Sequence, residues 1–539
     1  MDQQTETKKP SAPTYKQLSQ KHAEYDGDLW TNLHLLYAGG WAMQRNAQRF
    51  IERAPRERQD YFLWRIKSTA YVNFFARLVG YLTGSLFNET LNVAPAKDRR
   101  TDETPALPDA GFYDAFSLDC DLAGTDFSQF MRLALTDALV YRRALVQVDL
   151  PKAPAFQEGQ APRSLAEEDA LGLRRAYLIQ LPLESLFDYE KSPDGRFKWC
   201  VLHRIHRERA TPFADRASFQ HEFKIWWLAD GRALYTVLRS KPVTKDEQLD
   251  PEDELAVILP AQATSFTQIP ICELELPEAL WVGNQAGPLC QEHFRRRSDL
   301  MGSLCRSLVE IPYVKLGPEI PAVNGGISDA QSDPNRGHDV LARAREGAIV
   351  IGSEDEIGFA GPSGVGHEIA RAELKDCREE IFASVNAMAL QLENSAAAVG
   401  RSGDSKHEDK SATAIILTFL ATQTREFAQQ IMALVSSARG DGVAWSATGL
   451  NTFSSEDREQ VLSDAVTVET LQIPSPLFQK LSRVKVAFAV LPNATAREKA
   501  QIAKEIHANS HAEEHSDPLG RHYAQHSHSD VETDDEEES

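Results

Sequence analysis

Residues 367–392 read HEIARAELKDCREEIFASVNAMALQL, and this stretch decides the architecture of the chain. Its apolar residues recur at helical spacing and form one stripe on one face. The stripe consists of Leu374, Ile381, Val385, Met388 and Leu392. About 26 helical residues at 1.5 Å each predict a helix roughly 39 Å long.

Two further long helices are predicted, one on each side of this stretch. The earlier covers residues 289–309 and the later covers residues 411–437. The apolar stripe of the later helix contains Ile416, Leu420, Phe427, Ile431 and Leu434. A loop rich in Gly, Ser and Asp, at residues 394–410, leads into it.

The segment between the first two long helices has a different character. A long polar loop is predicted at residues 320–339, and short strand patterns surround it. These strand patterns lie at residues 313–316, 348–351 and 357–360. The sequence therefore predicts two long helices that flank a small α/β insertion.

Helices and one buried strand are predicted nearer the N-terminus. The elements are a helix over residues 60–87, a loop over 88–109, a helix over 127–141 and a strand over 144–150. The first helix carries Gly80 and Gly84, which suggest close packing at its far end.

Short β-like runs replace the helical period from residue 176 to residue 270. They read AYLIQLP, FKWCVLHRIH, FKIWWLA, ALYTVLR and LAVILP, with PDG, ADG and charged turns between them. This pattern predicts an antiparallel β-rich unit whose apolar faces need a cover, which the preceding helices can supply. The fold class is therefore α+β.

The C-terminal region is mixed. A strand is predicted at residues 484–491 and a helix at residues 494–508. The final residues, 511–539, combine acidic and histidine residues with few apolar ones. Such a composition cannot build a core, and it predicts a disordered tail.

Composition and charge indicate a folded protein that does not bind nucleic acid over its whole surface. The chain has 539 residues, of which 42% are hydrophobic and 25% charged, so most of it is expected to fold. The formal net charge is −21. Non-specific nucleic-acid affinity comes from Lys and Arg that displace phosphate counterions, so any DNA contact must be local.

The cysteines and the apolar runs predict a soluble protein made in a reducing cytoplasm. The six cysteines contain no CxxC pair, which argues against a disulfide framework and a zinc ribbon. The N-terminus lacks the apolar stretch of a signal peptide. The most apolar run, residues 414–421, is far shorter than the roughly 18 to 20 residues of a membrane span.

A glycine turn, GPSGVGHE at residues 361–368, resembles a phosphate loop but lacks its chemistry. A P-loop needs Lys for the phosphates and Ser or Thr for magnesium, and these places hold His367 and Glu368. A plain glycine turn into a helix, with carboxylates near its positive end, is the better interpretation.

Other chemical motifs also favour structural interpretations. His203 and His206 would point to opposite faces of a strand, which argues against a shared metal. Residues 295–297 are three arginines that fan out around a helix, so interhelix salt bridges are the expected role. We find no catalytic residue, no cofactor site and no metal site.

Several stretches, taken in order, carry a family resemblance. They are Arg65 with AYVN and GSLF at 70–73 and 84–87, ALVQVDLP at 144–151, AYLIQLPLESLFDY at 176–189, HFRRRSD at 293–299, IPYVKLG at 311–317 and GPSG at 361–364. In this order they resemble bacteriophage portal proteins, the ring-forming head-tail connectors through which DNA is packaged. Arg142 and Arg143 depart from the pattern, which has a glycine before the strand, and the acidic tail has no counterpart.

The resemblance implies a portal-type α+β fold with a helix-covered β-rich wing, a stem, a clip, a tunnel loop and a helical crown. Its parts are a flexible N-terminus (1–14), the wing (15–288), stem helix 1 (289–309), the clip (310–366), stem helix 2 (367–393), the tunnel loop (394–410), a long helix with the wing return (411–493), the crown helix (494–510) and the tail (511–539).

The resemblance also implies partners and a location. A homododecameric ring at the unique capsid vertex of the virion would pass double-stranded DNA during packaging and ejection. It would dock the terminase large subunit, a head-tail adaptor and the major capsid or scaffolding protein, after assembly in the host cytoplasm. The residues expected to face DNA in the channel are Arg401, Lys406 and Lys410. ATP chemistry would belong to the motor, so this chain is not expected to be an enzyme.

Two other functions stay open on the sequence alone. One is a nucleic-acid-processing enzyme that uses the glycine turn at residues 361–368 and nearby carboxylates. The other is a capsid scaffold component that oligomerises through residues 411–437 without forming a channel.

Overall fold

The structure is a computed structural model, and it divides into two units. These are residues 1–87 with 91–451, and residues 88–90 with 452–539. The residues it describes are 13–96, 107, 109–151, 162, 164–209, 217–244, 247, 249–307, 311–315, 356–360, 365–395, 405–451, 475–491 and 501–506. None of the helices within these ranges combines the length and apolar character of a membrane span.

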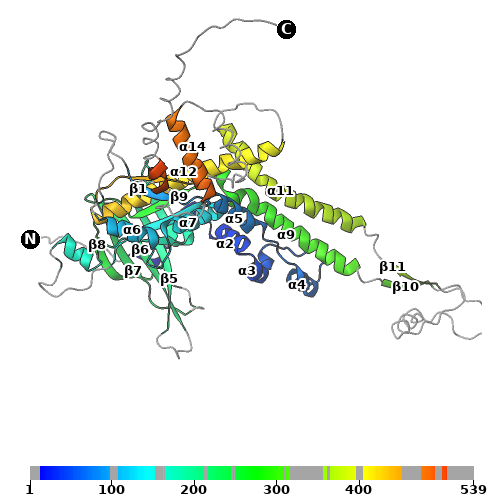
Figure 1. The fold of residues 1–539 in the computed structure, drawn as a ribbon. Helices are drawn as coiled ribbons and strands as arrows, with labels where there is room; N and C mark the ends of the chain where they lie inside the picture. The colour runs from blue at the N-terminus through cyan, green and yellow to red at the C-terminus, as the bar shows by residue number, and fades with distance from the viewer. Residues whose placement is uncertain are drawn as a thin grey trace, which may run out of the picture. The chain divides into compact units, whose positions relative to one another are not determined.

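The first unit is a mixed α+β fold, as predicted (Figure 1). Its α-helices are α1 (Tyr15–Leu18), α2 (Gly27–Ala38), α3 (Gly40–Arg45), α4 (Gln59–Ser68), α5 (Phe74–Leu86), α6 (Ala110–Leu118), α7 (Phe127–Tyr141), α8 (Leu165–Ala170), α9 (Val282–Ser307), α11 (Val365–Ser395) and α12 (Ser405–Arg439). Short 3-10 turns are η1 (Ala47–Arg49), η2 (Leu183–Ser185) and η3 (Glu278–Leu280).

The strands of this unit form four antiparallel sheets. They are β1 (Asn92–Pro95), β2 (Arg143–Asp149), β3 (Tyr177–Leu181), β4 (Leu186–Lys191), β5 (Phe197–Glu208), β6 (Ser218–Ala229), β7 (Arg232–Arg239), β8 (Ala256–Ala263), β9 (Ile271–Glu275), β10 (Ile311–Lys315), β11 (Glu356–Ala360) and β12 (Trp445–Thr448). The strand orders are β3-β2-β9, β4-β5-β6-β7-β8, β1-β12 and β10-β11.

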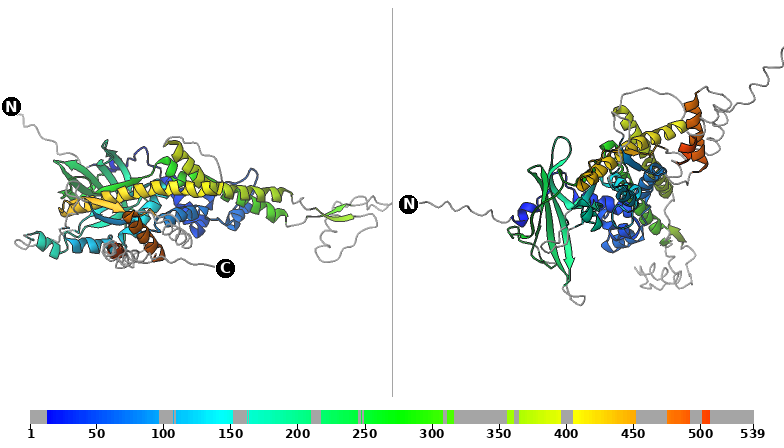
Figure 2. Two further views of the ribbon diagram at one scale, coloured as in Figure 1. Left: turned by 45° about the horizontal axis from the view of Figure 1, so that its top comes forward. Right: turned by 60° about the vertical axis from the view of Figure 1, so that its left-hand side comes forward.

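The three-stranded sheet lies in the core beside two helices. Its central strand β2 is buried along almost its whole length, and Val146 pairs with Gln180 and with Cys272. Helices α7 and α12 both contact this sheet, and Figure 2 shows α12 running along the molecule beside it. The predicted bounds of α7 and of the strand after it are confirmed, because Phe127, Phe130 and their helical repeats face the core.

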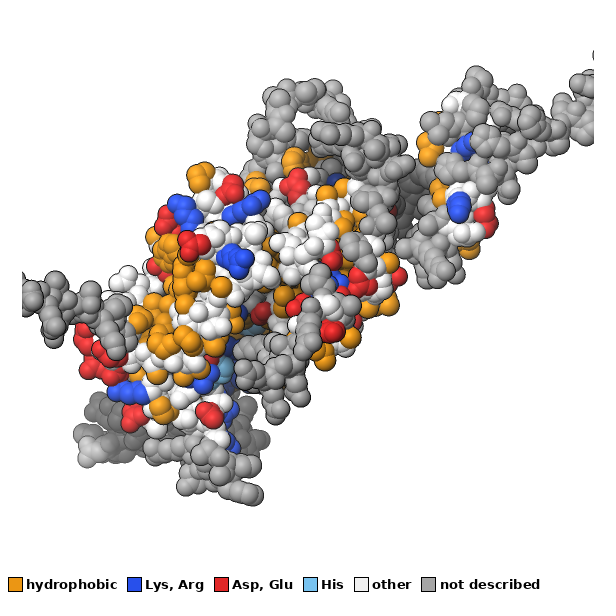
Figure 3. Space-filling model, turned by 90° about the vertical axis from the view of Figure 1, so that its left-hand side faces the viewer, with side chains coloured by type: hydrophobic (Ala, Val, Ile, Leu, Met, Phe, Trp, Pro, Cys, Tyr) orange, Lys and Arg blue, Asp and Glu red, His pale blue; other side chains and the backbone are white. Residues whose placement is uncertain are grey.

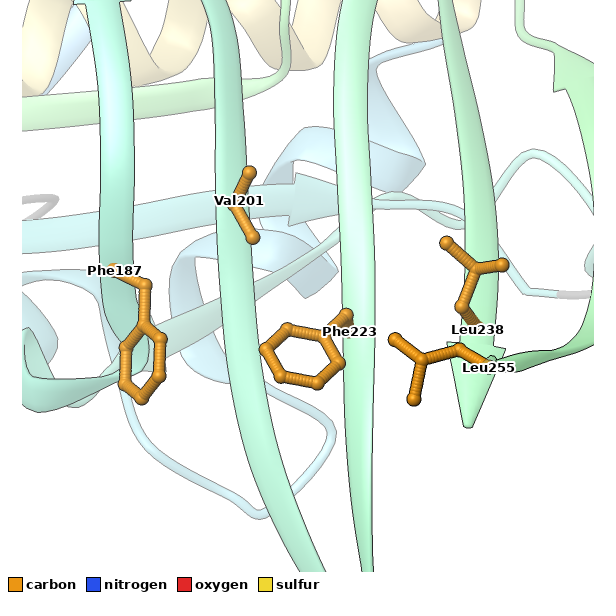
Figure 4. Close-up of a cluster of buried hydrophobic side chains, with 5 residues drawn as sticks. All are labelled: Phe187, Val201, Phe223, Leu238 and Leu255. Carbon is orange, nitrogen blue, oxygen red and sulfur yellow. The ribbon is translucent and has the colours of Figure 1, made fainter. Parts of the chain in front are cut away.

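The five-stranded sheet has its own apolar cluster. Its buried members are Phe187, Val201, Phe223, Leu238 and Leu255, drawn in Figure 4. Tyr15, Leu18 and Tyr25 from the N-terminal segment pack against them. An element that precedes the β unit therefore covers this face, as the sequence suggested. Asp230 and Gly231 both have positive φ angles, 51° and 72°, and make the tight ADG turn between β6 and β7.

The predicted helix over residues 60–87 is in fact two helices. Helix α4 ends at Ser68 and α5 begins at Phe74. The side chain of Asn73 caps α5 by accepting a hydrogen bond from the Ala76 amide (2.9 Å), and its Nδ2 donates to the Tyr37 carbonyl (2.7 Å). The apolar stripe continues across this break, so periodicity alone could not reveal it. The close packing suggested for Gly80 and Gly84 is also wrong, since a Cβ at either would meet nothing within 4 Å.

Arg142 occupies the position where the portal resemblance leads us to expect glycine. It ends α7 with a φ of 76°, in the left-handed region that favours glycine. Arg142 Nε donates to the Leu276 carbonyl (3.3 Å), and the Leu276 amide donates to the Arg142 carbonyl (2.9 Å). These contacts with the end of β9 hold a strained backbone that glycine would adopt freely.

Two other predicted bounds change. Helix α9 begins at Val282, before Pro288, because its first turns pack tightly on the core. Helix α12 begins at Ser405 and so includes residues 405–410, which were predicted as loop. The later turns of this helix bury an apolar stripe, and the helix can extend toward the N-terminus through polar residues that need no burial. The predicted strands at 348–351 lie outside the described residues.

The second unit contains α14 (Pro476–Val490), and residues 501–506 are also helical. The strand predicted at residues 484–491 is therefore wrong. Ser475 accepts a hydrogen bond from the Phe478 amide (3.3 Å) and Pro476 occupies the first turn, which together start a helix that runs through the alternating apolar residues. The helical residues 501–506 fall inside the predicted crown helix, and residues 511–539 lie outside the described part.

Asp137 gives the fold a pH-dependent stability. It lies on α7 and accepts a hydrogen bond from Gln180 Nε2 (2.5 Å), while burial raises its pKa from 3.8 to about 6. The folded state therefore holds this proton more tightly than the unfolded state does, and stability from this group is lost as pH rises from about 4 to about 6.

We expect Asp137→Asn to be more stable than the wild type at pH 8, by up to about 3 kcal/mol at 1.36 kcal/mol per pKa unit. The difference should shrink to below about 1 kcal/mol at pH 4, where Asp137 is protonated in the folded state and partly protonated in the unfolded state. Urea unfolding of both proteins at pH 4, 6 and 8 measures it. A difference that does not change with pH would contradict the assignment.

Candidate functional site: the paired helices α9 and α11

Helices α9 and α11 run side by side and antiparallel, away from the sheets (Figures 1 and 2). Arg296 in the middle of α9 pairs with Glu373 near the start of α11, whereas His293, which precedes Arg296, and Phe382, which follows Glu373, both stack edge-on against Phe74 of α5. At the far end the chain continues as the antiparallel pair β10 and β11, in which Tyr313 is opposite Gly358. The predicted helices 289–309 and 367–393 thus correspond to α9 and α11.

The contact between the two helices is apolar. Cys290 and Phe294 of α9 are buried, as are Cys377, Ile381 and Met388 of α11. Burial raises the pKa of Cys290 to about 12, so it carries no thiolate at neutral pH. All six cysteines are free thiols. Of the stripe that the sequence predicted on residues 367–392, Ile381, Val385 and Met388 are buried and Leu374 is partly buried.

The three consecutive arginines of α9 point to different neighbours, as predicted from their spacing. Arg296 forms ion pairs with Glu292 on its own helix (2.5 Å) and with Glu373 on α11. Arg295 Nε donates to the Phe50 carbonyl (2.6 Å). The salt bridge of Arg296 to Glu373 confirms the expected interhelix role.

A buried arginine from α4 braces the middle of α9. The Arg65 side chain is 4% exposed and its guanidinium pairs with Glu57 (2.8 Å), whose side chain is 3% exposed. Arg65 Nη1 also donates to Ser298 Oγ (2.8 Å) and to Asp299 (3.0 Å) on α9. The hydrogen bond to Glu57 keeps the pKa of Arg65 above its ordinary value. The region of α4 and the distant helix α9 are joined at one cation.

Two glycines let α9 pack closely against α4 and α7. Gly302 lies against α4, where an added Cβ would meet Arg65 Cδ at 2.8 Å, and Tyr61 donates to the Gly302 carbonyl (2.6 Å). At the other end, Gly283 lies against the Val140 carbonyl, which also accepts a hydrogen bond from Trp281 Nε1 (2.9 Å). The helix is thus fixed at its base and at its middle.

The glycine turn does not form a phosphate site in the described residues. Helix α11 begins at Val365, so Gly366, His367 and Glu368 lie in its first turn. A hollow of about 360 Å³ separates this turn from α9, and Arg296, which lines it, is paired with carboxylates. Residues 361–364 lie outside the described part, and no lysine is among the residues that line the hollow.

The predicted channel residues can be placed only in part. Arg401 lies outside the described residues, and Lys406 and Lys410 fall in the first two turns of α12. Their role stays a prediction. His203 and His206 face opposite sides of the sheet, as expected: His203 Nε2 lies 2.8 Å from His221 Nδ1, and His206 Nε2 lies 3.1 Å from Glu222. No group of three metal-binding side chains occurs among the described residues.

Sequence reasoning missed the residues that brace the helix pair. Arg65 belonged to the family resemblance, but nothing in the sequence paired it with Glu57 or with Ser298. A second buried arginine, Arg439 at the end of α12, forms ion pairs with Asp441 (2.9 Å) and Asp109 (2.8 Å). Buried arginines in an otherwise apolar pattern were the available signal, because a buried charge requires a partner.

Comparisons with known proteins give no match to a family model or a curated protein. Among solved structures, the chain is similar to a chain from the neck of an empty GTA particle with C6 symmetry, at 12% identity and a TM-score of 0.37, covering 79% of this chain and 95% of that one. It is also similar to a chain from the virion of a native gene transfer agent (GTA) particle, at 12% identity and a TM-score of 0.33, covering 88% and 98%.

We expect Arg65→Met to lower the free energy of unfolding by about 3 to 5 kcal/mol, because it leaves the Glu57 carboxylate buried without its cation. The double variant Arg65→Met with Glu57→Gln should recover much of this loss, since no uncompensated charge then stays buried. Chemical denaturation of the four proteins of this cycle gives the coupling. Equal losses in the single and double variants would show that the pair is not energetically linked.

Gly302→Ala tests the close approach of α4 to α9. The new Cβ would press on Arg65 Cδ, and overpacking of this kind costs about 1 to 3 kcal/mol. Gly80→Ala is the matched control in α5, where open space and higher helix propensity predict a gain of about 1 kcal/mol. Thermal unfolding should move the two variants in opposite directions, and a stabilised Gly302→Ala protein would contradict the packing argument.

Proposed function

We propose that this chain is the subunit of a bacteriophage portal ring, the channel for double-stranded DNA at the unique capsid vertex. The observation that carries the proposal is the antiparallel pair α9 and α11, which connects a sheet-rich body to a strand pair at its far end. A long helix, α12, then returns across the body. This order matches the parts that the portal resemblance implies for residues 15–505.

In this proposal, α9 and α11 form the stem, and β10 and β11 belong to the clip. The two larger sheets with their helices are the wing, and the start of α12 follows the tunnel loop. The bracing by Arg65 suits this role, because a stem must keep its angle to the wing while a stiff polymer passes. The clip would dock the terminase large subunit during packaging and a head-tail adaptor afterwards, and the rim would meet the major capsid or scaffolding protein.

The charge of the chain supports transit of DNA instead of tight binding. Each subunit carries a formal charge of −21, so a dodecamer would carry about twelve times that value and would repel DNA over most of its surface. A few channel cations would then act as weak, sequence-independent guides. We assign this role to Arg401, Lys406 and Lys410, and we place ATP hydrolysis in the partner motor.

Native mass spectrometry with negative-stain imaging at moderate salt tests the assembly. Twelve subunits of 60.1 kDa give an expected mass near 720 kDa, and the particles should be rings with a central hole. A 60 kDa monomer that persists at every concentration and salt would oppose the portal proposal. Closed particles without a hole would favour the scaffold alternative.

The enzyme alternative makes a separate prediction. We expect the purified protein to hydrolyse neither ATP nor DNA, since the glycine turn lacks the lysine and hydroxyl that phosphate chemistry requires. Glu368→Ala is the informative variant, because Glu368 is the carboxylate nearest the turn. Hydrolysis by the wild type that this variant loses would overturn the non-enzymatic assignment.

A further inference from the structure

The outer edge of the five-stranded sheet is apolar, and the described N-terminal residues bond to the chain directly before β8, where Thr14 forms a bridge with Glu254. Strand β8 is the last strand in the order β4-β5-β6-β7-β8, and no described strand pairs with its outer side. Val257 is 54% exposed and Ile258 is 52% exposed. Figure 3 shows hydrophobic side chains gathered on the end of the molecule where this sheet lies. A free, apolar strand edge is a template for pairing with another strand.

The opposite side of the same sheet has a second free edge. Strand β4 pairs with β5 only from Phe197 to Leu202, whereas β5 continues beside β6 as far as Glu208. Residues 203–208 of β5 therefore have no described strand on their other side. Ile205 in this segment is 54% exposed. The two free edges face away from each other, so they cannot meet within one chain.

The charges at the two edges are complementary. Arg204 and Arg207 are exposed on the free segment of β5, and Arg209 follows them. The loop that leads into β8 carries the exposed carboxylates of Asp250, Glu252 and Glu254. Glu252 lies 3.5 Å from Lys16, and both of these side chains are exposed. A basic edge and an acidic edge on one sheet favour a second copy of the chain as the partner.

The strand order fixes the orientation of such a contact. Successive strands of this sheet are antiparallel, so β5 and β8 run in opposite directions. The register places β8 level with residues 199–204 of β5, where β4 lies at the edge. A neighbouring copy that is also shifted along the strands would bring residues 203–208 of its β5 against β8 in antiparallel pairing. That pairing puts the basic end of β5 next to the acidic loop before β8, whereas parallel pairing would put it beside neutral residues. Ile205 and Val257 then share one face, because Val201 and Leu238 belong to the same buried cluster.

We propose that β8 of one subunit pairs with residues 203–208 of β5 in the next subunit, which joins the five-stranded sheets head to tail. A head-to-tail contact uses two different surfaces and leaves one of each free, so it repeats until a ring closes. Pro260 lacks an N–H group and limits the length of the ladder on β8. The inference rests on the proposed function for its ring, and it adds the surface that links the subunits.

Cysteine pairs in the full chain test the contact. The double variant Ile205→Cys with Val257→Cys should form a ladder of disulfide-linked dimers, trimers and larger species on oxidation. Each single variant should form none of these, and neither should Ile205→Cys with Leu118→Cys, which uses a more exposed apolar position away from the edges. The single variants also control for the native thiols. A dimer from Val257→Cys alone would indicate symmetric edge pairing and would overturn the proposal.

The outcomes separate this inference from the proposed function. Rings that form without any ladder would overturn the inference and leave the portal proposal intact. A ladder in open chains that never close would support the inference and oppose the portal proposal. The N-terminal segment is the rival partner, since the Leu255 amide donates to the Pro13 carbonyl (3.2 Å) at the start of this edge. A ladder that appears only after deletion of residues 1–12 would show that the chain covers its own edge.

A charge exchange gives an independent measurement. Arg207→Glu should reduce the yield of the ladder several-fold at low salt, and the added substitution Glu254→Arg should restore it. Neither change touches the buried cluster, so both proteins are expected to fold. A yield that is the same in all three proteins would overturn the orientation argued above.

Discussion

The structure depends on one buried cation, the guanidinium of Arg65. It joins Glu57, which precedes α4, to Ser298 and Asp299 in the middle of α9. A charge in this position is costly to bury, and it is tolerated because carboxylate and hydroxyl groups satisfy it from three directions. The contact also fixes the position of one helix against another. It sets where α4 meets α9, and α11 then follows α9 through the apolar seam of Cys290, Phe294, Cys377 and Ile381.

The rest of the first unit is arranged around this braced helix pair. The base of α9 is seated on α7 through Gly283 and Trp281, and α7 in turn packs on the buried strand β2. Helix α12 contacts the same sheet and ends at Arg439, a second buried arginine that is held by carboxylates. The five-stranded sheet is different, because its core is a separate cluster covered by the N-terminal segment and its two outer edges are free. The helix pair thus has its charged and apolar groups satisfied within the chain, whereas the five-stranded sheet leaves described edge residues exposed.

The proposed portal role uses these features in a consistent way. A ring subunit needs one part that keeps its shape under load, and the paired helices with their buried ion pairs supply it. It also needs two unlike surfaces that can meet head to tail, and the opposite edges of one antiparallel sheet supply those. Its acidic surface opposes tight binding of DNA, which suits a channel through which the polymer must move in both directions. None of these features requires a catalytic centre in this chain.

The sequence by itself determined the α+β class, the long helices and the antiparallel unit, because apolar periodicity reports which face of each element is buried. It also predicted that the arginines at 295–297 would separate and that His203 and His206 would face opposite ways, since both follow from the geometry of a single element. Only the tertiary structure revealed the break before Asn73, the early start of α9 before Pro288, and the helix where a strand was predicted at 484–491. It alone paired Arg65 with Glu57 and Ser298, and it alone placed residues 203–208 of β5 and strand β8 at opposite edges. Local patterns record burial within one element, whereas the contact of Arg65 with α9 and the position of sheet edges depend on residues that are distant in the chain.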